Sequence, residues 1–279
     1  PDNLLFTNGS DEILNFAFMA FCDNNHPAAF ADIIYGFYSV FAAINRVPYK
    51  TIPLKEDLSL DHADYYGIGH TIFIANPNAP TGLALSREEI EGILKANPHN
   101  VVVVDEAYVD FGGESCVPLI HKYDNLLVTQ TFSKSRSMAG ARLGFGVGCR
   151  VLIADLNTVK YSTNPYNVNA MTMAAGVGTL ADEDYTRRNC QTIMENRAYV
   201  TEELQKLGFT LTDSRTNFVF ARHPQMDGET LYKALKDRGI LVRHFTAPRI
   251  DQYNRITVGT RAEMDALLTA IREILEDMV

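Results

Sequence analysis

Lys134 is the residue whose type and surroundings point most directly to chemistry in this sequence. It stands in the segment TFSKSRSMAGARLG, residues 131–144, just after the apolar run 126–128, which is predicted to be a buried strand. An amine at a strand end is placed to form a Schiff base with an aldehyde cofactor, if burial or nearby cations disfavour its charged form. Arg136 and Arg142 are candidates for those cations, and the planar fork of Arg142 could also grip a phosphate. The plainer interpretation is a lysine in a polar surface loop, which would be favoured if this segment stood alone.

Three further polar segments follow or open predicted elements. Residues 76–82 (NPNAPTG) follow the apolar run 71–75, and residues 105–108 (DEAY) follow the run 101–104. Residues 8–11 (NGSD) open a predicted helix, whose free N–H groups could hold a phosphate. Because ligands of open α/β sheets bind outside the carboxyl ends of the strands, these segments and the lysine are expected to surround one ligand.

The side chains in these segments match the needs of one cofactor that has an aldehyde, a pyridinium ring, a phenolate oxygen and a phosphate. Asp105 could keep the pyridinium nitrogen protonated, so that the ring accepts electrons. Asn78 and Tyr108 are candidate donors to the phenolate oxygen, and Tyr35 is the candidate aromatic lid over the ring. The predicted phosphate site consists of Gly9, Ser10, Thr131, Ser133 and Arg142, with Asp11 beside them in the first helical turn. Each part alone could be a helix cap, a turn or a core aromatic, so the prediction depends on their occurring together.

The composition is that of an ordinary globular enzyme. The 279 residues are 46% hydrophobic and 21% charged, which is enough for one large or two modest domains. The net charge of -9 argues against nucleic acid or an anionic membrane as the main partner. No apolar run approaches the roughly 20 residues of a membrane span. The chain begins with Pro1 and shows no signal peptide, and we interpret its front as cut or processed.

Neither the cysteines nor the histidines have the spacing of a metal site. The seven histidines are scattered, and so are the four cysteines: Cys22, Cys116, Cys149 and Cys190. We therefore expect no metal, and we expect reduced, mostly buried thiols in a cytoplasmic protein.

Helices are predicted where apolar residues recur with helical spacing behind a capping residue. One is predicted over residues 10–21, with Ser10 as its N-cap. Another begins at Ser86, and the spacing of Ser86 and Glu89 is that of a capping box.

The apolar runs are predicted to form a parallel sheet. Residues 101–104 are β-branched and do not alternate with polar residues, so they should be buried on both faces, as strands of parallel sheets are. Residues 126–128 and 143–147 are expected to continue this sheet. Together with the helices, these runs predict an α/β fold: a wound, mostly parallel sheet with helices on both faces.

The chain is predicted to divide into a large cofactor-binding domain (1–172), a linking helical region (173–207) and a small α+β C-terminal domain (208–279). The elements expected in the small domain are strands at 218–221, 240–242 and 255–258, a helix over 228–238 and a final helix from Arg261.

In this order, the segments resemble those of the fold-type I pyridoxal-phosphate aminotransferases, most closely their histidinol-phosphate branch. The resemblance extends from Asn8 to the C-terminal helix. It includes TNF at 216–218, LVR at 241–243 and, most typical of that branch, RITVGTR at 255–261. It implies fold type I, pyridoxal phosphate joined to Lys134, and a homodimer in which the neighbouring subunit completes the site.

The resemblance also implies substrates. By it, Arg255 grips the anionic end of the substrate and Arg243 assists, whereas both could otherwise be plain surface charges. Histidinol phosphate would be the amino donor and 2-oxoglutarate and glutamate the second pair, with Lys134 carrying a proton between the substrate Cα and C4′ of the cofactor. The alternatives are an aromatic-amino-acid aminotransferase, a threonine-phosphate decarboxylase, the effector domain of a regulator, or a truncated chain that binds the cofactor without turnover.

Two departures from the family pattern bear on these expectations. Many relatives have an asparagine directly before Pro-Thr-Gly, where this chain has Ala79, so either Asn78 takes that role or the contact is lost. By the resemblance, several dozen residues would precede the Gly9 region, among them part of the small domain and an arm toward the neighbouring subunit. Their absence from this sequence keeps the truncated chain among the alternatives.

Overall fold

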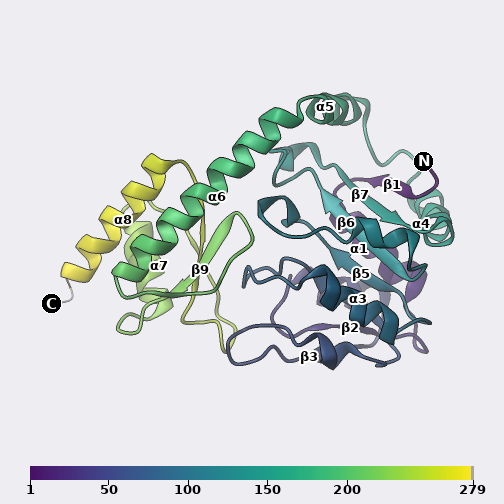
Figure 1. The fold of residues 1–279 in the computed structure, drawn as a ribbon, viewed down its shortest axis with the longest axis horizontal. Coiled ribbons are helices and arrows are strands. Elements are labelled where there is room, and N and C mark those ends of the chain that lie inside the picture. The colour runs from purple at the N-terminus through teal and green to yellow at the C-terminus, as the bar shows by residue number, and fades with distance from the viewer. Residues whose placement is uncertain (278–279) are drawn as a thin grey trace.

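The chain folds into a large part around a seven-stranded sheet and a small part around a four-stranded sheet, in a computed structural model that describes residues 1–277 (Figure 1). The long helix α6 (Glu183–Lys206) runs from the large part to the small one, where it packs beside α8 (Arg261–Glu276). The predicted linking region falls on α6 and on α5 (Ala170–Ala181), and the division into domains stays a prediction. No helix within residues 1–277 is both long and apolar enough to cross a membrane.

The large sheet is wound and mostly parallel, as predicted. Its spatial order is β1-β7-β6-β5-β4-β2-β3. The strands are β1 (Leu4–Thr7), β2 (Ala28–Ala31), β3 (Tyr49–Ile52), β4 (Thr71–Ala75), β5 (Val102–Asp105), β6 (Leu126–Thr131) and β7 (Gly144–Gly148). The pairs from β3 to β6 are parallel, whereas β7 is antiparallel to both β6 and β1.

The expectation that residues 143–147 continue the parallel sheet was wrong in direction. A parallel neighbour requires a crossover of a dozen or more residues, usually through a helix. The connection between β6 and β7 contains only the 3₁₀ turn Ala139–Ala141 and reverses the chain instead. Lys134 and Arg142 therefore lie together in one reversing loop at the carboxyl end of β6.

Helices cover both faces of the large sheet. On one face, α1 (Ser10–Phe21), α2 (Phe37–Asn45) and α4 (Arg150–Thr163) share a core with Phe73 and Val103 of the strands. On the other face, α3 (Arg87–Ala96) packs against Ile72, Ile74 and Val102 together with short 3₁₀ turns. Successive strand residues thus enter opposite cores, which explains why these strands show no polar alternation. The 3₁₀ turns are His62–Tyr65, Val109–Phe111 and Val117–His121.

The starts of α3 and α1 differ in how well the sequence predicts them. The capping box at α3 is confirmed: Ser86 Oγ accepts from the Glu89 N–H at 3.2 Å, and Glu89 Oε2 accepts from the Ser86 N–H at 2.7 Å. Ser10 is not the N-cap of α1. Gly9 is, with a φ of 80° and no side-chain cap. A Cβ on Gly144 of β7 would collide with the backbone of Gly9 and Ser10, so β7 approaches the start of α1 closely.

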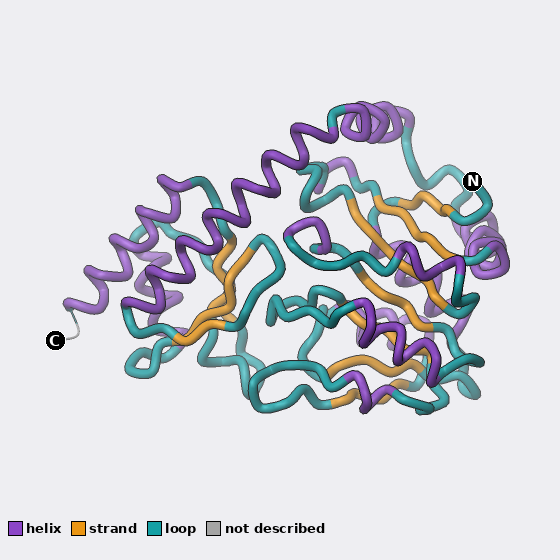
Figure 2. Tube along the Cα trace, viewed as in Figure 1, coloured by secondary structure: helices purple, strands orange, loops and turns teal. Residues whose placement is uncertain are grey.

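The small part is an antiparallel sheet covered by helices (Figure 2). Its order is β10-β11-β9-β8, from the elements β8 (Thr210–Leu211), β9 (Phe218–Arg222), α7 (Gly228–Asp237), β10 (Arg243–His244) and β11 (Asn254–Thr257). The strand expected over 240–242 is not formed. The N–H groups of Gly239 and Ile240 close the end of α7 on Lys236 O and Leu235 O, so that strand pairing begins only at Arg243.

The loop between β10 and β11 is fastened to the large part by one arginine. Arg249 Nη1 donates to Asp32 Oδ2 at 2.7 Å, and Nη2 donates to Leu54 O and Lys55 O, each at 2.7 Å. The loop joins the two strands that carry Arg243 and Arg255, and this contact fastens it to the segments that follow β2 and β3 of the large part.

Candidate active site

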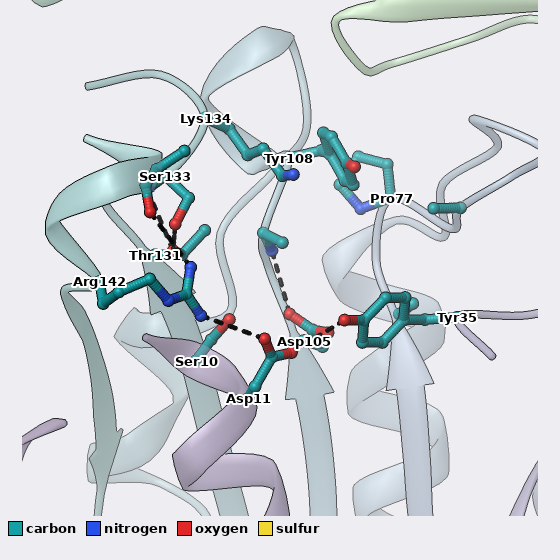
Figure 3. Close-up of a pocket in the computed structure, with 14 residues that line it drawn as sticks. Ser10, Asp11, Tyr35, Pro77, Asp105, Tyr108, Thr131, Ser133, Lys134 and Arg142 are labelled. Carbon is teal, nitrogen blue, oxygen red and sulfur yellow. Dashed lines mark hydrogen bonds and ion pairs between the residues drawn. The ribbon is translucent and has the colours of Figure 1, made fainter. Parts of the chain in front are cut away.

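The carboxyl ends of β4, β5 and β6 meet at a cavity of about 140 Å³ beside the start of α1 (Figure 3). The structure brings most of the predicted cofactor residues to its wall: Ser10, Asp11, Tyr35, Asp105, Tyr108, Thr131, Ser133, Lys134 and Arg142. Gly9 and Asn78 are the predicted cofactor residues that lie outside the wall.

Asp105, the last residue of β5, presents a buried carboxylate to the cavity. Its side chain is hydrogen-bonded on both oxygens: Oδ1 accepts from the Ala107 N–H at 3.2 Å and from Thr129 Oγ1 at 3.3 Å, and Oδ2 accepts from the Tyr38 hydroxyl at 3.1 Å. Burial raises the pKa of Asp105 to about 6 although these donors lower it, and the charge of Asp11 raises it further. A cationic group in the cavity, such as a pyridinium, would therefore stabilise the ionised carboxylate.

Lys134 reaches the opposite side of the cavity. Its Nζ lies 5.3 Å from the centroid of the Tyr108 ring, and Figure 3 shows the two side chains next to each other. The next residue, Ser135, donates from Oγ to Asp110 Oδ2, which anchors the loop on the segment that follows β5. The amine of Lys134 is thus held near an aromatic face.

Arg136, which the sequence offered as a cation beside the lysine, points elsewhere. Its Nη1 donates to Thr179 O of α5 at 3.4 Å, and its guanidinium lies 5.4 Å from the centroid of the Phe132 ring. Of the two arginines considered, only Arg142 reaches the cavity wall.

Hydroxyls and one guanidinium form the side of the cavity suited to a phosphate. Thr131 Oγ1 accepts from the Ser133 N–H at 3.1 Å and lies 2.9 Å from Ser133 Oγ. Arg142 Nη2 pairs with Asp11 Oδ2 at 3.2 Å. Gly9 lies behind this guanidinium: a Cβ there would be 2.5 Å from Arg142 Nη2 and would push the guanidinium from this position, and the φ of 80° at Gly9 also favours glycine. The residues present therefore fit the phosphate of the predicted cofactor.

Tyr35 stands at the cavity edge with its hydroxyl anchored. Tyr35 OH donates to Asp11 Oδ1 at 3.0 Å, and its ring stacks on Phe37 at a centroid distance of 5.6 Å. Asp11 therefore joins Tyr35 to Arg142 across the cavity wall (Figure 3). The role of Tyr35 as a lid over a cofactor ring stays a prediction.

The structure does not bring Asn78 to this site. Its Nδ2 donates to Ile33 O and to Thr81 Oγ1, each at 3.0 Å, and the side chain borders a separate cavity. Ala79 lines the cofactor cavity in its place. A buried amide bonds to the acceptors that packing supplies, and here neither acceptor belongs to the wall of the cofactor cavity. Tyr108 is then the remaining predicted donor to a phenolate oxygen.

Arg255 and Arg243 both lie outside the cavity wall. The Arg255 guanidinium is 5.0 Å from the centroid of the Phe218 ring, and that ring meets Tyr108 edge-on at 5.2 Å. One aromatic ring thus separates Arg255 from a wall residue of the cavity. Arg243 is exposed, with its guanidinium 5.5 Å from the centroid of the Phe245 ring.

Tyr38 contributes a hydrogen bond to the site, although the sequence did not indicate it. Its ring packs in the core formed by α1, α2 and α4 against the sheet. No local signal shows that its hydroxyl reaches Asp105, since 67 positions separate the two residues.

Within the described residues, no group of three or more His, Cys, Asp or Glu side chains could hold a metal ion.

A lysine amine, a buried carboxylate and an arginine–hydroxyl cradle around one cavity define a class of enzyme that works through a phosphorylated aldehyde cofactor. The family model described as aminotransferase class I and II matches residues 1–271. The chain belongs to this family and is an aminotransferase.

Named relatives and a solved structure agree with the family. The chain is 48% identical to histidinol-phosphate aminotransferase 1 of Bordetella parapertussis over 276 residues, which cover 98% of this chain and 78% of the relative. It is 50% identical to histidinol-phosphate aminotransferase 2 of Dechloromonas aromatica over 268 residues, 96% of this chain and 75% of that protein. The crystal structure of histidinol-phosphate aminotransferase from Sinorhizobium meliloti in complex with pyridoxal-5'-phosphate has the same fold, with a TM-score of 0.90 at 22% identity over 100% of this chain and 78% of that one.

Proposed function

We propose that this chain transfers the amino group of histidinol phosphate to 2-oxoglutarate, with pyridoxal phosphate in the cavity between Lys134 and Asp105. The observation that carries the proposal is the placement of three charged side chains around one small cavity: Asp105 ends β5, Lys134 and Arg142 come from the loop between β6 and β7, and all three line the cavity. An amine, a carboxylate and a guanidinium match the aldehyde, the ring nitrogen and the phosphate of this cofactor.

Each side chain has a task in this reaction. The bound cofactor supplies an electron sink for the substrate Cα. Lys134 Nζ would take the proton from that Cα as general base and then, as general acid, deliver it to the aldehyde carbon of the cofactor, C4′. Asp105 would accept a hydrogen bond from the protonated ring nitrogen, the Tyr108 hydroxyl would donate to the phenolate oxygen, and Arg142 would hold the phosphate together with neighbouring hydroxyls.

The choice of substrate rests on the relatives and on Arg255. The relatives named above are histidinol-phosphate aminotransferases at 48% and 50% identity. Histidinol phosphate offers a phosphate, which the planar guanidinium of Arg255 can bind by two parallel hydrogen bonds. Arg255 lies on a strand, one ring away from the cavity, so it is anchored near the reacting end.

A panel of amino donors tests the substrate. Initial rates are measured with histidinol phosphate, phenylalanine and O-phosphothreonine, each with 2-oxoglutarate, after an absorbance scan of the reconstituted protein. Histidinol phosphate should give the highest kcat/KM. Preference for phenylalanine would indicate an aromatic-amino-acid aminotransferase instead, and carbon dioxide release from phosphothreonine would indicate a decarboxylase. An absorbance band without amino transfer would indicate a chain that only binds the cofactor.

We also propose that the chain forms a homodimer. An apolar cavity of about 450 Å³ lies between α5 and the loop before it, against the strand face that carries Phe6. Tyr166 and Val177 on this surface are 90% and 69% exposed. Exposed apolar surface of this kind is typical of interfaces, and two-fold dimers are the commonest assembly.

We also propose a cytoplasmic location, because all four cysteines are free.

A further inference from the structure

Tyr38 is a fully buried tyrosine whose hydroxyl donates to the carboxylate of the cavity. Tyr38 OH lies 3.1 Å from Asp105 Oδ2, which joins the second residue of α2 to the last residue of β5. As a core aromatic it would need no hydroxyl. Burying a hydroxyl is costly unless it is hydrogen-bonded, and the bond to Asp105 offsets this cost.

The aromatic core fixes the direction of the hydroxyl. The Tyr38 ring meets Phe30 edge-on at 5.7 Å and Tyr35 edge-on at 6.0 Å, and it lies tilted against Phe73 at 5.8 Å. Its side chain is 0% exposed, so bulk water does not compete for the hydroxyl. Tyr38 therefore points at Asp105 with little freedom to choose another partner.

The two oxygens of Asp105 are not equivalent. Oδ1 accepts two hydrogen bonds, from Ala107 N–H and from Thr129 Oγ1, which use both of its lone pairs. Oδ2 accepts only from Tyr38, so it retains one lone pair. Asp105 lines the cavity, and by this count Oδ2 is the oxygen with the capacity to accept a further hydrogen bond.

The same hydrogen bond favours the charged form of Asp105. Burial and the nearby charge of Asp11 raise the pKa of this carboxyl, and among the groups that lower it the Tyr38 hydroxyl has the largest effect. A phenol that donates to a carboxylate stabilises the ionised acid. If Oδ2 lost this donor, the buried carboxyl would retain its proton to a higher pH and would be a poorer acceptor.

We propose that Tyr38 is a positioning residue for Asp105: its hydroxyl holds Oδ2 in place and ionised, so that the free lone pair receives the protonated ring nitrogen of pyridoxal phosphate. The inference rests on the proposed cofactor but not on the proposed amino donor. By this inference the Tyr38 hydroxyl, which lies outside the cavity wall, aligns the Asp105 carboxylate toward the ring of the cofactor.

The test compares Tyr38→Phe with a matched control, Tyr65→Phe. Tyr65 is also 0% exposed, it belongs to the core on the opposite face of the sheet, and its hydroxyl has no hydrogen-bond partner in the described part of the chain. Both variants delete one buried hydroxyl and keep the ring, so a loss caused by burial or packing alone should appear in both.

The first readout uses pyridoxal phosphate labelled with ¹⁵N at the ring. In the wild type the ¹⁵N shift should report a protonated nitrogen at neutral pH, in Tyr65→Phe the same, and in Tyr38→Phe a shift toward the unprotonated value. The affinity for the cofactor should fall on the order of tenfold in Tyr38→Phe only. Equal ¹⁵N shifts and affinities in all three proteins would overturn the inference while leaving the proposed cofactor intact.

The second readout needs no cofactor. With ¹³C-labelled aspartate, the Asp105 carboxyl is titrated in the cofactor-free protein, and Tyr38→Phe should raise its midpoint by about one pH unit or more. An unchanged midpoint would reject the role of Tyr38, whereas failure of the wild type to bind the cofactor would reject the proposed function instead. If Tyr38→Phe does not fold, 3-fluorotyrosine at position 38, a stronger donor, should lower the midpoint, and no change would again reject the role.

Discussion

Arg243 and Arg255 stand directly opposite each other across the antiparallel pair of β10 and β11, and both guanidinium groups lie over the ring of Phe245. Like charges at facing positions of a sheet repel, and the negative face of an aromatic ring offsets part of that cost. A substrate dianion held near the two arginines would offset the remaining repulsion between them, which is a physical reason to expect an anion site there.

Arg255→Lys should raise the KM for histidinol phosphate and also weaken 2-oxoglutarate, because one arginine is expected to serve both anions in turn. Lysine keeps the charge but cannot make two parallel hydrogen bonds. The expected loss in kcat/KM corresponds to about 2–4 kcal/mol, and Arg243→Ala should cost less. Steady-state kinetics with each substrate varied in turn measures both effects. Unchanged constants for both substrates in Arg255→Lys would make the arginine structural.

Lys134→Ala should abolish amino transfer, because the chain would lose the amine that joins the cofactor and moves the proton. Wild-type protein reconstituted with pyridoxal phosphate should absorb above roughly 400 nm, as protonated imines of this cofactor do. Borohydride reduction followed by peptide mass spectrometry should place the cofactor on the Lys134 peptide. A label on a different lysine would refute the assignment.

Asp105→Asn should bind pyridoxal phosphate and yet turn over far more slowly. The amide cannot balance the positive charge of a protonated ring nitrogen, so the ring becomes a weaker electron sink. The expected loss is on the order of several kcal/mol of transition-state stabilisation, measured as kcat for histidinol phosphate. A fully active Asn variant would mean that Asp105 serves only as a cap for the turn after β5.

The stability of the cofactor-free chain should depend on pH through Asp105. Burial raises the pKa of this carboxyl from 3.8 to about 6, so the folded state binds the proton more tightly than the unfolded state does. The protonated carboxyl therefore stabilises the folded state fully below about pH 4, and this stabilisation is lost as the pH rises through 6. At pH 7.5, Asp105→Asn should be more stable than the wild type by up to about 3 kcal/mol, and near pH 4.5 by much less. Urea unfolding at the two pH values measures this, and an equal difference at both would contradict it.

A charge placed on the apolar surface of α5 should disrupt the proposed dimer. Val177 is 69% exposed and borders the apolar cavity, so Val177→Glu should leave the monomer folded and weaken self-association. Light scattering at micromolar concentration should give a dimer for the wild type and a smaller mass for the variant. Lys233→Glu, a charge change on α7 of the small part, serves as the control. A monomeric wild type would refute the proposal.

The sequence predicted the features that depend on short stretches of chain. Unalternating β-branched residues between 101 and 104 predicted a doubly buried strand, and the spacing of Ser86 and Glu89 predicted a capping box, because both signals arise from neighbouring residues. Lys134 and Asp105 could be chosen because they follow strands, and the carboxyl ends of strands meet at one edge of a wound sheet.

Tertiary structure decided the features that depend on residues far apart in the chain. The direction of β7 followed from the lack of a crossover helix, and Arg136 turned from the cavity toward a carbonyl of α5. Asn78 bonded within its own turn and to Ile33, which the sequence could not distinguish from a contact with the cofactor. The Tyr38 hydroxyl reached Asp105 across 67 positions. Side-chain direction is set by the partners that packing supplies, and those partners are known only once the chain has folded.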